Sequence, residues 1–184
     1  MNDYRRRVKR YQSRVNYHVK EFFKRMNEGD VIQATEKAWG ALSAFVNIYA
    51  ITFRNTEVKR DYRKREVLEE FLNKIKNFDL EVEELIAKEY RGHTGTLARS
   101  LWNLHSFFCG GTYIKDDDIK RYLQYLYKFL PILQEYSNII AKYYLRGNYL
   151  SFYKMGNSKY SNKYWGSCFS QILYRFSRVH GNQF

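Results

Sequence analysis

Apolar side chains recur every three or four positions over most of residues 1–145, whereas strict alternation of apolar and polar residues is scarce. This period is typical of amphipathic α-helices, in which one face is buried and the opposite face meets water. Only one proline and ten glycines occur among the 184 residues, so few positions interrupt such helices. The pattern therefore predicts an all-α fold.

A helical hairpin is predicted at the start of the chain. The first helix runs from about residue 4 to residue 27, with basic side chains opposite its apolar face. Gly29 suits a left-handed helix end, and Asp30 with Gln33 forms a capping box that opens a second helix over about 31–53. The second helix is broadly apolar, and Gly40 would allow another helix to approach it closely, so we expect it to be central.

The remaining pattern predicts further helices, giving a bundle of four to six. Residues 54–65 form either a charged connector or the start of a third helix, and Asp79 is expected to cap a short helix over about 80–90. The predicted buried positions of the third helix are Val67, Leu68, Phe71, Leu72 and Ile75. The stretch LARSLWNLHSFFC, residues 97–109, forms another helix that ends at Gly110. A last helix covers about 119–145, in which Pro131 is expected to cause a kink or a break.

Several classes of site are disfavoured by the sequence. Asp116, Asp117 and Asp118 are adjacent, but their position before an apolar-periodic run favours helix capping over metal binding. Cys109 and Cys168 form no CxxC motif, so we expect reduced thiols, no metal and no cofactor. No apolar run is long enough to cross a bilayer, and the N-terminus is too charged for a signal peptide, so a cytoplasmic protein without a membrane partner is expected.

Charge is concentrated at the two ends of the chain. The 32 basic and 19 acidic residues give a net charge of +13. Residues 1–25 carry nine Lys/Arg and two acidic residues, and residues 146–184 carry six Lys/Arg and no acidic residue. A neutral body with two basic ends favours a nucleic-acid partner over a charge excess that serves only solubility. The candidate phosphate-binding residues of the N-terminal helix are Arg5, Arg6, Arg7, Arg10 and Arg14.

The last 39 residues differ from the body in composition, so we divide the chain into a helical bundle, 1–145, and a basic aromatic tail, 146–184. The tail holds ten aromatic residues interleaved with cations. This composition is typical of surfaces that bind single-stranded nucleic acid. It equally suits a tail that packs on the bundle or docks on a partner. Its candidate nucleic-acid-binding residues are Lys154, Lys159, Lys163, Tyr164 and Trp165.

Two segments of the chain resemble the archaeal PaREP family. The segment EGDVIQATEKAWGALSAFVNIYA, residues 28–50, resembles the family's Gly-Asp turn followed by a helix with Gln-Ala-x-Glu-Lys-x-Trp-Gly-Ala. The segment LWNLHSFFCGG, residues 101–111, is similar to its second marker, a Leu-His followed by aromatics and glycine. PaREP proteins are in turn similar to the HEPN superfamily, whose members are small helical bundles and usually dimers. The superfamily includes toxin and defence ribonucleases as well as catalytically inert members, so the resemblance implies this fold and either kind of function.

The resemblance implies a catalytic pair, Arg99 and His105, which matches the HEPN pattern of an arginine, four to six residues and a histidine. Histidine can transfer the protons of RNA cleavage, and arginine can hold the phosphate, so no metal would be needed. A six-residue step along one helix separates the two side chains by about 120° and about 9 Å, so they converge only through a second subunit or a bent helix. Alternatively, His105 borders a core stripe formed by Leu97, Leu101, Leu104 and Phe108.

These observations lead to one expectation with two alternatives. We expect a homodimeric, HEPN-like protein that binds RNA, with Arg91 extending its basic surface, and that cuts RNA as a metal-independent ribonuclease of the toxin or defence type. The first alternative is a non-catalytic module of the same fold that binds nucleic acid or a protein such as an antitoxin. The second alternative is a structural or assembly protein.

Overall fold

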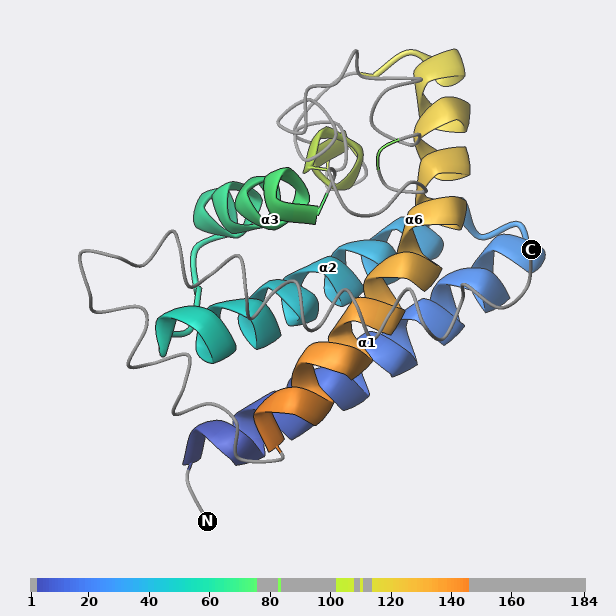
Figure 1. The fold of residues 1–184 in the computed structure, drawn as a ribbon. Coiled ribbons are helices and arrows are strands. Elements are labelled where there is room, and N and C mark those ends of the chain that lie inside the picture. The colour runs from blue at the N-terminus through green and yellow to red at the C-terminus, as the bar shows by residue number, and fades with distance from the viewer. Residues whose placement is uncertain (1–2, 76–82, 84–101, 108–109, 111–113, 146–184) are drawn as a thin grey trace.

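The structure is a computed structural model that describes residues 3–75, 83, 102–107, 110 and 114–145. Four helices follow one another in it: α1 (Asp3–Asn27), α2 (Val31–Arg54), α3 (Asp61–Ile75) and α6 (Asp116–Tyr143). Residues 102–107 are also helical, and the described part of the chain contains no strand. The predicted all-α class is confirmed (Figure 1).

The predicted hairpin of α1 and α2 is present, and its turn has the expected chemistry. Gly29 adopts a φ of +75°, a left-handed conformation that glycine accepts without a Cβ clash. The Asp30 carboxylate accepts a hydrogen bond of 3.1 Å from the backbone N–H of Gln33, as expected for a helix N-cap. The three-residue turn therefore reverses the chain, and the two helices run side by side (Figure 1).

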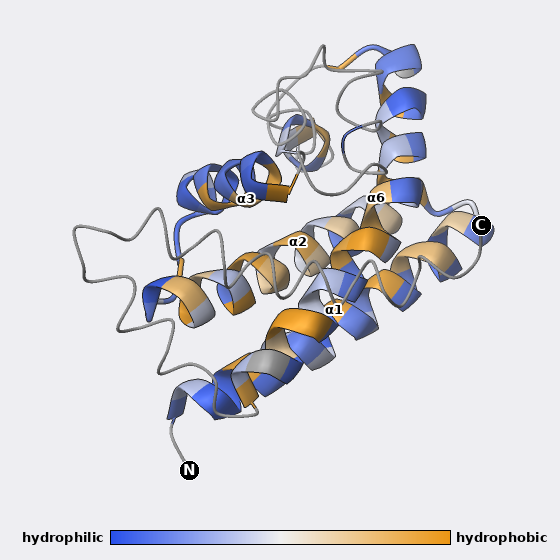
Figure 2. Ribbon diagram, in the orientation of Figure 1, coloured by the Kyte–Doolittle hydropathy of each residue, from blue (hydrophilic) through white to orange (hydrophobic). Residues whose placement is uncertain are grey.

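Helix α2 is the central helix of the described bundle. It contacts α1, α3 and α6, and most of its residues from Ala41 to Phe53 are buried. Figure 2 shows the contrast with α1, which is hydrophilic along much of its length. All five apolar positions predicted for α3 are buried against α2 and its neighbours, so this part of the core prediction is confirmed. The apolar periodicity, which is a local property, placed both helices correctly.

Helix α6 runs antiparallel to α1. The Gln12 side-chain amide donates a hydrogen bond of 3.1 Å to Asn138, and the Gln134 amide donates one of 2.9 Å to Asn16. Residue numbers therefore increase along α1 in the direction in which they decrease along α6, which shows that the two helices are antiparallel. Because α6 also contacts α2, the three long helices enclose one core.

Two expectations for α6 require correction. Asp116, Asp117 and Asp118 were expected to cap this helix, but the N-cap is Lys115, which makes no side-chain cap bond. The aspartates lie within the first turn, where negative charge favours the helix dipole without capping it. Of the kink or break predicted at Pro131, the break is wrong, because α6 continues through this residue. Figure 1 shows instead that the two ends of α6 run in different directions, as the backbone bond lost at a proline favours.

An aromatic cluster joins α2, α3 and α6. Phe71 of α3 is fully buried, and its ring lies 4.6 Å from the ring of Phe45, 5.7 Å from that of Tyr49 and 5.3 Å from that of Tyr136. The ring planes meet at 65–79°, the edge-to-face arrangement that aromatic quadrupoles favour. This cluster fixes α3 on the bundle. Within the described ranges, no helix has the length and apolar character needed to cross a membrane.

Candidate functional site

The outward face of α1 is a row of cations, which we call the α1 basic face. Its side chains recur at helical spacing opposite the buried residues Val8, Val15, Val19 and Phe22. Every cation of this face is exposed to solvent. From the first to the last, at 1.5 Å per residue, the row extends about 27 Å. The α1 basic face comprises Arg6, Lys9, Arg10, Arg14, Lys20 and Lys24.

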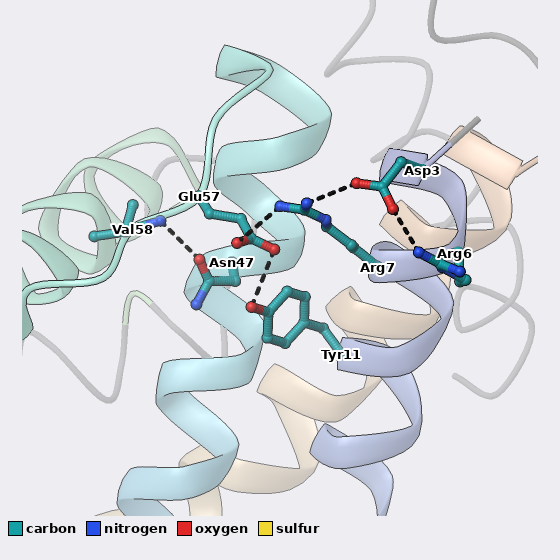
Figure 3. Close-up of polar contacts among 7 residues, drawn as sticks. All are labelled: Asp3, Arg6, Arg7, Tyr11, Asn47, Glu57 and Val58. Carbon is teal, nitrogen blue, oxygen red and sulfur yellow. Dashed lines mark hydrogen bonds and ion pairs between the residues drawn. The ribbon is translucent and has the colours of Figure 1, made fainter.

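The first turns of α1 are tied down by carboxylates (Figure 3). Asp3 pairs with Arg6 at 2.8 Å and with Arg7 at 2.7 Å. Arg7 also pairs at 3.1 Å with Glu57, which follows α2 and accepts a hydrogen bond of 3.1 Å from the Tyr11 hydroxyl. Arg7 and Tyr11 therefore hold α1 against the connector after α2, which is a structural task.

Other cations of the α1 basic face have no carboxylate partner. Within the described residues, Lys9, Arg10, Arg14 and Lys20 make no ion pair, whereas Arg6 pairs with Asp3 and Lys24 with Glu28. The guanidinium groups of Arg10 and Arg14 lie 5.3 and 5.7 Å from the centre of the Tyr11 ring. Four exposed charges without internal compensation attract counterions or an anionic partner.

His105, the predicted catalytic histidine, lies against the central helix. Its Nδ1 atom is 3.3 Å from Oε1 of Glu36, and its ring stacks on that of Trp39 with centroids 4.9 Å apart and planes at 16°. Trp102 closes the cluster, with its ring 5.1 Å from that of Trp39. The His105 side chain is 15% exposed and that of Glu36 is 39% exposed. The pair thus reaches solvent through its carboxylate more than through its imidazole.

A second histidine, His18, lies where α1 crosses α2. A Cβ atom built on Gly40 would stand 2.9 Å from three atoms of the His18 ring, so only glycine leaves room for this contact. Nδ1 of His18 is buried and has no hydrogen-bond partner among the described residues. Burial lowers the pKa of His18, and the charges of Lys37 and Arg14 lower it further. The imidazole is therefore held in its neutral form near a concentration of positive charge.

One turn of α2, Glu36 to Gly40, contacts both histidines. Glu36 and Trp39 contact His105, while Gly40 lies against His18. The sequence indicated that Gly40 permits close approach, and it singled out His105, but it did not join Glu36 to His105. Glu36 and His105 are 69 positions apart, so no local pattern links them. The Glu-Lys-x-Trp-Gly marker, which contains Glu36, was the one sequence feature that pointed to this turn of α2. Among the described residues, no three His, Cys, Asp or Glu side chains are grouped to hold a metal ion.

The predicted site residues are thus divided. Arg5, Arg6, Arg7, Arg10 and Arg14 all lie on α1, and His105 lies beside α2. Other predicted site residues fall outside the described residues, as do Cys109, Cys168 and, apart from residue 83, the short helix expected near 80–90. The predicted pairing of Arg99 with His105 therefore stays a prediction. Those undescribed site residues are Arg91, Arg99, Lys154, Lys159, Lys163, Tyr164 and Trp165.

A polar cluster near the C-terminal end of α2 attaches α3. The carboxylate of Glu70 forms ion pairs with Arg54 and with Lys74, whose Nζ lies 2.6 Å from Oε1 of Glu70. It also accepts a hydrogen bond of 3.1 Å from the Tyr49 hydroxyl. Burial raises the pKa of Tyr49. Burial and the charge of Arg54 lower the pKa of Lys74 to about 8, although its ion pair with Glu70 acts in the opposite direction. Every charge here has a partner, so the cluster is structural.

The environment of His18 predicts an acid-sensitive contribution to stability. The unfolded chain takes up a proton at this imidazole near pH 6.5, whereas the folded chain does so only at lower pH. The contribution of His18 is therefore fully present above about pH 6.5, falls below it, and levels off beneath the folded-state pKa. Because the ring is partly exposed, solvent screening keeps this loss small.

Urea unfolding of the protein and of His18→Gln between pH 5 and pH 8 measures this effect. The difference in unfolding free energy between the two proteins should change in favour of the variant as the pH falls. A difference that is constant across this range would contradict the lowered pKa.

The comparisons with known proteins add one family. The model of the archaeal PaREP1/PaREP8 family matches residues 13–129, a range that includes most of α1, all of α2 and His105. Neither the search of curated proteins nor the search of solved structures found a match. Residues 1–12 and the basic tail lie outside the matched range.

Proposed function

The chain belongs to the archaeal PaREP1/PaREP8 family, and from this premise we propose that it is an RNA-binding protein whose α1 basic face contacts the phosphate backbone. One observation carries the proposal: four exposed cations of this face, Lys9, Arg10, Arg14 and Lys20, have no carboxylate partner among the described residues. Neutralising phosphates with such side chains releases counterions, which supplies most of a non-specific nucleic-acid affinity. The excess of positive charge in residues 146–184 also supports RNA as the partner.

The proposal predicts a steep salt dependence that depends on this face. Replacing Lys9, Arg10, Arg14 and Lys20 together by glutamine should reduce the slope of log K against log salt by about 3, at about 0.7 per lost contact with single-stranded RNA. Fluorescence anisotropy of a labelled oligoribonucleotide between 50 and 300 mM salt measures the slope for the full-length protein.

A matched control variant removes the same charge elsewhere. Lys59, Lys115, Lys120 and Lys128 are also exposed, but they lie on α6 and the connectors. Their replacement by glutamine should leave most of the slope in place. An affinity independent of salt, or an equal loss in both quadruple variants, would show that the α1 basic face is not the RNA contact.

The Glu36–His105 contact favours a second function, metal-independent RNA cleavage by a cytoplasmic, HEPN-like homodimer. Glu36 lies 3.3 Å from Nδ1 and orients the imidazole. In the reaction, the imidazole accepts the 2′-hydroxyl proton, the 2′-oxygen attacks phosphorus, and the bond to the 5′-oxygen breaks. The 5′-oxygen then takes a proton from the imidazolium, which leaves a 2′,3′-cyclic phosphate and a 5′-hydroxyl. Arg99, from the same or the partner subunit, would hold the phosphate.

The non-catalytic alternative keeps the RNA-binding face and assigns His105 to packing. Its ring stacks on Trp39 and is mostly covered, which a structural histidine would also show. In that case the aromatic tail would be the element that docks an antitoxin or assembly partner. Cleavage assays on Glu36 and His105 variants separate the two functions.

A further inference from the structure

Tyr17 is the most exposed aromatic residue on the α1 basic face. Its side chain is 54% exposed, and Arg14 and Lys20 lie one helical turn before and after it. Burying such a ring would be favourable, yet its only described ring contact is the edge of His18, with centroids 5.2 Å apart. A large aromatic surface therefore remains open in the middle of a row of cations.

A cation from the second helix reaches the same ring. Nζ of Lys37 lies 6.0 Å from the centre of the Tyr17 ring. Tyr17 thus stands between Arg14 on its own helix and Lys37 on α2, with Glu21 as the nearest carboxylate along α1. Neither cation makes an ion pair among the described residues, so both charges are available to an anion.

The pKa of His18 responds to the same two cations. Its pKa is lowered first by burial and then by Lys37 and Arg14, the same two cations that flank Tyr17. The seam between α1 and α2 at Gly40 is therefore a region of positive potential with no compensating carboxylate among the causes. A phosphate bound here would relieve the repulsion between these charges.

We infer that Tyr17, Arg14 and Lys37 form a subsite for one unpaired nucleotide, in which the Tyr17 ring stacks on the base and the two cations hold the adjoining phosphates. The inference rests on the proposed function and narrows its substrate to single-stranded RNA. An exposed ring set among cations is the arrangement that binds single strands, since every base has a face that can stack. In a duplex the base faces are already stacked, so Tyr17 would find no partner there.

The test compares ring-removing and ring-keeping variants. Tyr17→Leu should weaken the binding of a single-stranded oligoribonucleotide by about 5- to 150-fold at fixed salt, the range that corresponds to one lost base stack. Tyr17→Phe should bind as the unaltered protein does. The affinity for the same sequence as a duplex should be equal in all three proteins.

Tyr62 on α3 supplies the matched control. It is 44% exposed, and Arg63 lies 5.9 Å from its ring, so it resembles Tyr17 chemically but lies on another helix. Tyr62→Leu should leave binding to single-stranded RNA unchanged. Because both tyrosines are exposed, thermal unfolding of the variants should match that of the unaltered protein, and this separates lost binding from lost folding.

A second readout uses His18. Addition of the oligoribonucleotide should raise the midpoint of the His18 proton NMR titration in the unaltered protein, and the rise should be smaller in Lys37→Gln. Unchanged binding by Tyr17→Leu, or an equal loss in Tyr62→Leu, would overturn the subsite. If Tyr17→Leu binds normally but the four-cation variant still shows a reduced salt dependence, the RNA-binding function is retained and only the subsite is overturned. If the unaltered protein binds no RNA, both the proposed function and the subsite are overturned.

Discussion

Under the proposed ribonuclease function, replacing His105 by alanine is expected to slow metal-independent RNA cleavage by a factor of about 10² to 10⁴, the usual effect of removing a positioned acid–base group. Glu36, 3.3 Å from Nδ1 of His105, orients the imidazole, so Glu36→Gln should also slow cleavage, but by less. The measurement is the rate at which end-labelled single-stranded RNA is cut in a chelating buffer. Products with a cyclic phosphate and a 5′-hydroxyl should accumulate.

The controls distinguish chemistry from packing. Because His105 stacks on Trp39, its loss also affects local packing, and thermal unfolding of each variant has to be recorded beside the rate. Arg99→Ala should also lower the rate, and its thermal unfolding is recorded in the same way. Cleavage that survives both His105→Ala and Arg99→Ala would remove this pair from the mechanism and leave the non-catalytic, RNA-binding function.

Replacing Phe71 by alanine should lower the free energy of unfolding by about 3–5 kcal/mol, which is a large part of the stability of a domain of this size. The ring is fully buried and contacts Phe45, Tyr49 and Tyr136 on two other helices, so its removal leaves a cavity that none of them can fill alone. Equilibrium denaturation in urea, followed by far-UV circular dichroism, measures the change.

Tyr62 on the same helix is the control for this substitution. Its ring is largely exposed, so Tyr62→Ala should change the unfolding free energy by no more than about 0.5 kcal/mol. Phe71→Leu keeps most of the volume and should cost less than Phe71→Ala. A loss below about 1.5 kcal/mol for Phe71→Ala would mean that the aromatic cluster is not the core that joins α3 to the bundle.

The sequence predicted the elements whose causes are local. The glycine and aspartate of the turn after α1 determine a chain reversal through a φ of +75° and a capping hydrogen bond, and both involve residues within three positions. The apolar period located α1, α2 and the buried face of α3. Local reasoning failed at Asp116–Asp118, which do not cap α6, and of the kink or break expected at Pro131 only the break is wrong, because packing of α6 on α1 and α2 maintains the helix.

By itself, then, the sequence determined that the chain forms amphipathic helices, where its first hairpin turns, and that its positive charge gathers at both ends. Only the tertiary structure decided which polar groups meet. Glu36 reaches His105, Arg7 reaches Glu57, and His18 lies against Gly40, in each case across many intervening residues. The physical reason is range: capping and periodicity act between neighbours, whereas these contacts depend on how α1, α2 and residues 102–107 pack in space.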